Sequence, residues 1–219
     1  MESVKGKTVL LVGATGSIGH QTALLLAKSG AQLYLTGRNP EKLNRVAQEA
    51  QVPYDRVFAM DIAQADSVKA TMDKILALSP VIDILINATG IGIIKTMDSL
   101  TATEFEQTLQ VNLTGSFYVL QAILPAMKAL KKGLIIHVPG VLGKVPMAGA
   151  AAYSASKYGL RGMLQSIREE LKRTDIRITQ LFLGGVDSAF WDNIDLRVQR
   201  DKMILADEAA KAIWFLCQQ

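Results

Sequence analysis

Cysteine and histidine are scarce in this sequence of 219 residues. Cys217 is the single cysteine, so the chain cannot close an internal disulfide. His20 and His137 are the only histidines, so the sequence also lacks the Cys/His spacing of a zinc site, and we expect no metal. A chain without disulfides suits a reducing compartment. We therefore expect the protein to be cytoplasmic.

Long apolar runs and blocks of one charge are missing too. No run of about eighteen apolar residues predicts a membrane helix, and no signal-peptide pattern surrounds the first apolar stretch at residues 8–12. The formal net charge is +4, but the densest basic group is only Lys128, Lys131 and Lys132. A nucleic-acid surface would need basic residues gathered on one face. The sequence thus predicts a small-molecule partner, with no nucleic acid and no membrane.

What the sequence does contain is an alternation of short β-rich runs with longer helical patterns. The β-rich runs predict strands at residues 8–12, 32–36, 56–59, 82–86, 134–138 and 177–182. Helical periodicity lies between them, as at 21–29 and 41–50. This order predicts an α/β fold, a doubly wound parallel sheet of about six strands with helices on both faces. No repeat or linker divides the chain, so we expect one domain over residues 1–219.

A glycine-rich turn follows the first predicted strand and leads into a helix that begins near Ser17. Glycines let the backbone approach a pyrophosphate closely, and the amides of a helix N-terminus hold its charge. The strand-turn-helix context favours a nucleotide site over a turn that is only structural. The predicted cofactor-binding residues here are Gly13, Thr15, Gly16, Ser17, Ile18 and Gly19.

The second predicted strand runs into Gly37, Arg38 and Asn39, without an acidic residue. An acid at this place binds the ribose 2′-hydroxyl of NAD, whereas an arginine accommodates the 2′-phosphate of NADP. The segment therefore favours NADP(H) over NAD(H), which stays the alternative. A surface arginine ahead of the helix that starts near Pro40 is the competing interpretation of Arg38.

The next two strands also end in polar or glycine-containing segments. Asp61 and Ile62 follow the third predicted strand, and Asn87, Ala88 and Gly90 belong to the segment after the fourth. Ligands of open α/β sheets bind at the carboxyl ends of the strands. These residues are therefore predicted to contact the same cofactor, although Asp61 alone could simply cap a helix.

Tyr153 and Lys157 stand four residues apart in a predicted helix, so they share one face. A free tyrosine has a pKa near ~10, and a nearby ammonium favours its phenolate form. The pair therefore predicts acid/base chemistry. An exposed tyrosine and lysine without function would be the interpretation if the pair stood alone.

Taken together, these motifs resemble the short-chain dehydrogenase/reductase family over essentially the whole chain. The matching features are the turn at 13–19, Asp61, the tetrad at 87–90, Asn112, the run at 153–157 and the segment at 184–188. The resemblance implies a Rossmann-type fold and an oxidoreductase that interconverts a carbonyl and an alcohol by hydride transfer.

The resemblance also implies roles for single residues. Tyr153 would exchange a proton with the substrate and contact the cofactor, and Lys157 would bind the nicotinamide ribose and lower the tyrosine pKa. Asn112 would interrupt its helix and hold a water that connects Lys157 to solvent. In the segment after the sixth strand, Gly184, Val186 and Ser188 would contact the cofactor.

The chain departs from the family at the residue that polarises the substrate oxygen. The family places a serine thirteen residues before the tyrosine, where this sequence has Gly140 after Pro139. Loss of one preorganised donor costs about 10²–10³ in turnover. Milder departures are Ser17 in place of a glycine, Ala88 in place of an asparagine and Leu183 in place of a proline. A catalytically weakened NADP(H)-binding sensor or assembly protein is therefore the alternative function.

After the sixth predicted strand the sequence offers a loop, a helix at about 206–217 and no material for the family's seventh strand. Phe190, Trp191 and Met203 either cover a substrate or close the core, and the sequence does not separate these alternatives. The loops at 142–148 and 188–202 would shape the substrate site. Apolar residues on several faces of the predicted helices at 103–131 and 152–174 predict a homodimer.

Overall fold

The computed structural model describes residues 2–192, 194 and 197–219. Six strands form one sheet: β1 (Thr8–Val12), β2 (Gln32–Gly37), β3 (Val57–Ala59), β4 (Ile84–Asn87), β5 (Lys132–His137) and β6 (Asp175–Gln180). All neighbouring strands are parallel, in the order β3-β2-β1-β4-β5-β6. The order reverses direction between β1 and β4, and such a switch point opens a crevice at the carboxyl ends of the strands.

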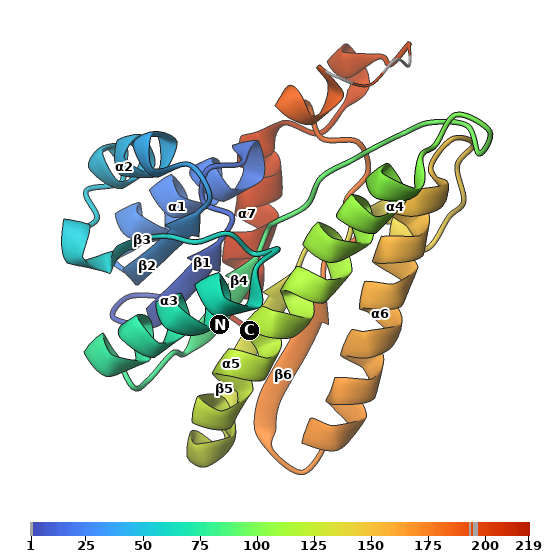
Figure 1. Ribbon diagram of the computed structural model, residues 1–219. Coiled ribbons are helices and arrows are strands. Elements are labelled where there is room, and N and C mark those ends of the chain that lie inside the picture. Colours follow the sequence, from blue (N-terminus) through green and yellow to red (C-terminus); the bar gives the residue numbers. More distant parts are fainter. Residues whose placement is uncertain (1, 193, 195–196) are drawn as a thin grey trace.

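Helices cover both faces of the sheet (Figure 1), as predicted. One apolar cluster joins the sheet to α1 (Ser17–Lys28), α2 (Pro40–Glu49) and α7 (Ala206–Leu216). The other joins it to α3 (Ala65–Leu78), α5 (Gly115–Leu130) and α6 (Ala151–Leu171). Alternate side chains of β1 divide between them: Val9 and Leu11 lie in the first cluster, Leu10 and Val12 in the second. The sheet is therefore buried on both sides, as parallel sheets require.

The ends of several strands differ from the prediction. The expected sixth strand at 177–182 lies two residues earlier, because Asp175–Gln180 pair with Lys132–His137 of β5. The fourth begins at Ile84 instead of residue 82, and the third at Val57. Hydrogen-bond pairing sets these bounds, whereas the sequence pattern follows apolar residues that continue beyond the ladder.

The helical stretch over 102–130 is not one regular helix. It consists of α4 (Ala102–Leu109), a π-helical turn (Gln110–Thr114) and α5. Asn112 lies in the π-helical turn and is 1% exposed, so the expected interruption is present. By length and composition the stretch would suffice to cross a membrane, which is weak evidence because helices that pack on a sheet pass the same test. Here Val119 and Ile123 lie in the core against the sheet.

Candidate active site

A cavity of about 560 Å³ lies at the carboxyl ends of β1, β4 and β5. It is lined by residues from the glycine turn, the segment after β4, the segment after β5, the start of α6 and the segment after β6. Among the predicted site residues that line it are Thr15, Gly16, Ser17, Ile18, Ala88, Gly90, Tyr153, Lys157, Gly184, Val186 and Ser188. The fold thus gathers in one place residues that are spread over most of the sequence.

The glycine turn is held by close backbone packing. Gly13 has φ +89°, and a Cβ on it would lie 2.8 Å from Cγ2 of Thr89. A Cβ on Gly19 would overlap the carbonyl oxygen of Gly13. Gly16 is the N-cap of α1 and has no side chain to accept hydrogen bonds from the first helical amides. Those amides remain available to an anion, which fits the pyrophosphate of a dinucleotide.

The residues after β2 lie beside this turn. A Cβ on Gly37 would lie 2.8 Å from Cγ2 of Thr15, so β2 ends directly against the turn. Arg38 is exposed. Asn39 caps α2, because its Oδ1 accepts a hydrogen bond from the Lys42 amide at 2.8 Å. Asn39 therefore has a structural role that its sequence context did not reveal.

Asp61, Ile62 and Asn87 do not line the cavity, but they shape its surroundings. Oδ1 of Asp61 accepts a hydrogen bond from the Ala63 amide at 3.0 Å and closes a local turn. Ile62 is buried and packs against Gly115 at the start of α5.

Asn87 ties the end of β4 to α5 and to the following turn. Its Nδ2 donates to Oγ of Ser116 at 3.1 Å, and its Oδ1 accepts from the amide of Thr89 at 3.0 Å. The Thr89 hydroxyl donates to the same Oδ1 at 2.5 Å. The buried Asn87 side chain thereby sets the turn that carries Ala88 and Gly90.

Tyr153 and Lys157 meet on the wall of the cavity. Nζ of Lys157 lies 5.4 Å from the centroid of the Tyr153 ring. A Cβ on Gly90 would lie 3.0 Å from the same Nζ, which shows how closely Lys157 approaches the segment after β4. Lys157 is 2% exposed. A buried ammonium without a carboxylate in these contacts is costly, and such arrangements are typical of functional sites.

Asn112 fixes the backbone between β4 and this pair. Its Oδ1 accepts from the Ile91 amide at 2.9 Å, and its Nδ2 donates to the Ile91 carbonyl at 3.0 Å. Nδ2 also donates to Oγ of Ser156 at 3.0 Å, and that hydroxyl donates to the Tyr153 carbonyl at 2.7 Å. Ser156 was missed as a site residue, because its sequence position within the helix gives no sign of this link.

Burial shifts the pKa values of both members of the pair. It raises the pKa of Tyr153 to about 12 and lowers the pKa of Lys157 to about 8. Burial is the cause of the raised pKa of Tyr153, because it disfavours the phenolate, and the expectation that Lys157 lowers this pKa stays a prediction. At neutral pH Tyr153 is a protonated phenol that can donate a proton.

Gly140 occupies the place expected for the polarising serine. A Cβ on Gly140 would lie 3.5 Å from Oη of Tyr153, close enough for a serine hydroxyl to reach the substrate oxygen. The backbone of Gly140 has φ +76° and ψ 161°, a region populated essentially by glycine alone. The sequence predicted the missing donor but not the backbone that excludes it.

Of the three apolar residues left open by the sequence, two line the cavity. The ring of Phe190 contacts that of Tyr153, with centroids 5.8 Å apart, and Trp191 packs against Phe190. Met203 does not line the cavity and instead lies against Gly185. Residues 193, 195 and 196 of the predicted loop at 188–202 lie outside the described residues.

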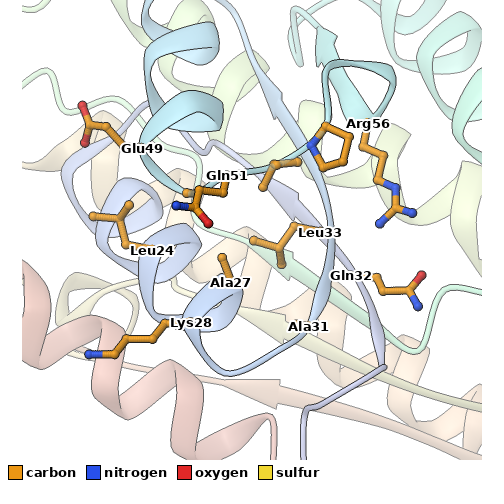
Figure 2. Close-up of a pocket in the computed structure, with 12 residues that line it drawn as sticks. Leu24, Ala27, Lys28, Ala31, Gln32, Leu33, Glu49, Gln51 and Arg56 are labelled. Carbon is orange, nitrogen blue, oxygen red and sulfur yellow. The ribbon is translucent and has the colours of Figure 1, made fainter.

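A second cavity, of about 540 Å³, lies near the other end of β2. Figure 2 shows Leu24 and Ala27 of α1 facing Leu33 of β2, with Glu49 and Arg56 at the rim. Glu49 forms an ion pair with His20 at 2.8 Å. None of the predicted site residues lines this cavity. The predicted site residues that line a cavity therefore all line the one around Tyr153.

Comparisons with known proteins agree with this geometry. The family model described as short chain dehydrogenase matches residues 7–199. An uncharacterized oxidoreductase of Staphylococcus saprophyticus is 31% identical over 222 residues, with 97% of this chain and 90% of that protein covered.

Two solved structures are also similar. A metagenomic short-chain oxidoreductase in complex with NADP has 30% identity and a TM-score of 0.85, with 100% of this chain and 93% of that chain covered. An alcohol dehydrogenase of Thermococcus sibiricus, complexed with 5-hydroxy-NADP, has 25% identity and a TM-score of 0.87, with 98% and 92% covered.

Proposed function

The chain belongs to the short-chain dehydrogenase family, and from that premise we propose that it is an NADP(H)-dependent oxidoreductase interconverting a carbonyl and an alcohol. The observation that carries the proposal is the placement of Tyr153 and Lys157. Both line the cavity that also contains the glycine turn, and Lys157 is almost completely buried there. A structural role alone would not favour burial of an ammonium beside a phenol.

The residues proposed to hold the cofactor line the cavity or lie next to it. The free amides at the start of α1 would bind the pyrophosphate, and Lys157 would bind the nicotinamide ribose. The further contacts would come from the residues predicted around them: Gly13, Thr15, Gly16, Ser17, Ile18, Gly19, Gly37, Arg38, Asn39, Asp61, Ile62, Asn87, Ala88, Gly90, Gly184, Val186 and Ser188. Bound NADPH supplies the hydride for carbonyl reduction.

Tyr153 is proposed as the acid that protonates the substrate oxygen. Its raised pKa keeps the proton on Oη at neutral pH, which suits reduction of a carbonyl. The ammonium of Lys157 stabilises the phenolate that remains after proton transfer. Asn112 positions this pair through Ser156 and the backbone of Ile91, and we propose that it also holds the water that returns a proton to Lys157.

NADP(H) is proposed as the preferred cofactor over NAD(H). Arg38 is exposed beside the glycine turn, where its guanidinium would form paired hydrogen bonds to a 2′-phosphate. The two similar solved structures were determined with NADP and 5-hydroxy-NADP, which supports the same choice. Calorimetry with NADPH and NADH tests it, and equal affinity or tighter NADH binding would contradict it.

A cofactor-binding sensor or assembly protein is the second candidate, and one observation favours it. Gly140 leaves the position of the polarising hydroxyl without a side chain, and its backbone conformation would be strained with a serine. Such a protein would bind NADPH with little or no turnover.

We also propose that residues 1–219 act as one cytoplasmic domain that forms a homodimer through α5 and α6. Phe117 of α5 is 42% exposed and Tyr158 of α6 is 41% exposed, so each helix carries an aromatic side chain that a second subunit would cover. Light scattering tests the dimer, and a stable monomer at micromolar concentration would refute it.

Turnover of simple carbonyls with NADPH tests the proposed function directly. We expect low but measurable consumption of NADPH with aldehydes or ketones, because the tyrosine is present and one oxyanion donor is missing. Tyr54→Phe, at an exposed tyrosine that does not line the cavity, is the control for Tyr153→Phe and should leave turnover unchanged. NADPH binding without any turnover, across aldehydes, ketones and alcohols, would favour the sensor.

A further inference from the structure

Phe190 contacts the proposed acid directly. Its ring meets that of Tyr153 edge to face, with centroids 5.8 Å apart and an angle of 68° between the planes. On its other side Phe190 packs against Trp191, at 5.1 Å and 76°. Both aromatic residues line the cavity. The ring of Phe190 therefore lies beside the place where a substrate oxygen would meet Tyr153.

Gly92 receives the tip of this ring. A Cβ on Gly92 would overlap Cζ of Phe190, so the ring rests on the backbone of the segment after β4. Gly92 is not among the glycines with a positive φ, and its backbone conformation would accept other residues. The glycine is thus required by the ring and not by the backbone. Phe190 connects two walls of the cavity that are remote in sequence.

The segment that carries Phe190 is braced by side-chain hydrogen bonds. Arg200 donates from Nε to Asp187 at 2.6 Å and from one terminal nitrogen to Asp192 at 2.8 Å. Its other terminal nitrogen donates to the Ser188 carbonyl at 3.1 Å. The indole of Trp191 donates to the Val186 carbonyl at 2.9 Å. These contacts flank Phe190 on both sides in the sequence and hold its ring in place.

The walls around the ring are apolar. The apolar residues that line the cavity include Ile91, Ile94, Val141, Leu142 and Met147. Lys157 is the one cationic side chain among the described lining residues. Two nearby lysines are engaged elsewhere: Lys95 pairs with Glu104 at 2.5 Å, and Nζ of Lys144 lies 4.1 Å from the Phe182 ring centroid. Because Lys157 is proposed to bind the nicotinamide ribose, a carboxylate or phosphate on the substrate would find no other cationic partner among the described lining residues.

From this geometry we propose that Phe190 determines specificity and that the substrate is an uncharged, apolar carbonyl compound with a small substituent beside the carbonyl. The assignment of a carbonyl rests on the function proposed above. A bulky substituent requires displacement of the ring, and a charged one finds no counter-charge. Gly92 is a positioning residue, because it acts only through the place that it leaves for Phe190.

The test compares Phe190→Ala, Phe190→Leu and Gly92→Ala on three kinds of substrate: short apolar ketones, bulky aryl ketones and keto acids matched in length. Phe190→Ala should raise kcat/KM for the bulky ketones relative to the short ones by about 10-fold or more, with Phe190→Leu intermediate. Gly92→Ala should lower kcat/KM for the short ketones, because the added methyl displaces the ring from the position that fits them.

Combining the variants separates this account from a general loss of structure. Gly92→Ala should have little further effect in the Phe190→Ala background, because the ring that it displaces is gone. Additive effects of the two substitutions would overturn the proposal. So would an unchanged substrate preference in Phe190→Ala, or a parent protein that prefers the keto acid to the matched ketone.

A binding measurement keeps the inference distinct from the proposed function. In a Trp214→Phe background Trp191 is the one remaining tryptophan, and its fluorescence reports ligands beside Phe190. With NADP⁺ bound, short ketones should quench it, keto acids should not, and bulky ketones should do so only with Phe190→Ala. If no carbonyl is turned over, the proposed function fails, but this binding profile still supports or overturns the role of Phe190.

Discussion

The two walls of the active-site cavity are built in different ways. The wall from residues 8–90 is defined by backbone contacts, such as the carbonyl of Gly13 against Gly19 and the end of β2 against Thr15. The wall from residues 139–204 is defined by side chains from distant segments, such as Phe190 against Gly92. The first wall matches the family's motifs closely. The second wall has Gly140 at the position where the family has a serine.

This difference separates the residues that are restricted by cofactor binding from those that are restricted by the protein's own substrate. Approach of a backbone to a pyrophosphate admits few solutions, and the glycine turn satisfies them. A substrate pocket depends on loop shapes that differ between members of one fold. Substitutions in the second wall away from its proposed cofactor contacts, such as Lys157 and Gly184, should therefore alter turnover and leave cofactor binding intact, and those in the first wall should do the reverse.

The largest expected effect is that of Tyr153→Phe. Removal of the acid should lower turnover by about 10²–10⁴, the usual contribution of a positioned proton donor. Affinity for NADPH, measured by calorimetry, should change little, because phenylalanine keeps the ring and removes only the hydroxyl. Turnover close to that of the parent would show that another group supplies the proton.

Gly140→Ser tests the missing donor and its backbone. The added hydroxyl would lie near Oη of Tyr153 and should raise turnover, with about 10²–10³ as the upper bound. The glycine-only conformation should at the same time lower the free energy of unfolding by about 1–3 kcal/mol.

Gly140→Ala is the matched control, because it has the same strain without the hydroxyl. It should be destabilised to a similar extent and gain no turnover. The gain of Gly140→Ser should disappear in a Tyr153→Phe background. A gain that is equal in the alanine variant would contradict the role of the hydroxyl.

Lys157→Met should separate stability from function. Burial of the ammonium lowers its pKa from 10.5 to about 8. At roughly 1.4 kcal/mol per pH unit, the charged form lowers the free energy of unfolding by about 3 kcal/mol at pH 7. Methionine removes that cost, so the free energy of unfolding should rise while NADPH binding and turnover fall. Lys69→Met, at an exposed lysine of α3, is the control and should change neither much.

The same pair of pKa values predicts a pH dependence of stability. Between about pH 8 and pH 10.5 the unfolded chain keeps the Lys157 proton, whereas the folded protein releases it. The unfolded state then binds more protons, so the contribution of Lys157 to stability rises with pH over this window. Urea unfolding at several pH values should show this rise in the parent relative to Lys157→Met, and identical pH profiles would contradict it.

Arg38→Ala should give the smallest effect and one limited to the first wall. Loss of charge-assisted hydrogen bonds to the 2′-phosphate should weaken NADPH binding by about 10-fold or more, with NADH binding unchanged. Arg45→Ala, at an exposed arginine of α2, should leave both affinities unaltered. If the two variants bind NADPH equally well, Arg38 is a surface residue.

The features that the sequence predicted and those that it did not predict divide in the same way. The order of β1 to β6 and the glycine turn follow from local patterns that neighbouring residues fix, and the helix break at Asn112 was expected from the family resemblance. The unusual conformation of Gly140 and the contact between Phe190 and Gly92 arise from segments distant in sequence, which spacing cannot bring together. The raised pKa of Tyr153 depends on burial, which is a property of the folded chain.

The central claim is hydride transfer to a carbonyl with Tyr153 as the acid. Transfer of deuterium from labelled NADPH to the substrate tests this claim most directly. The parent protein and Tyr153→Phe are incubated with NADPH deuterated at the transferable position and a short apolar ketone, and the alcohol is analysed by mass spectrometry. We predict one deuterium on the former carbonyl carbon with the parent and a product yield lower by about 10²–10⁴ with the variant. Unlabelled alcohol, no alcohol at all, or equal yields from the two proteins would contradict the account.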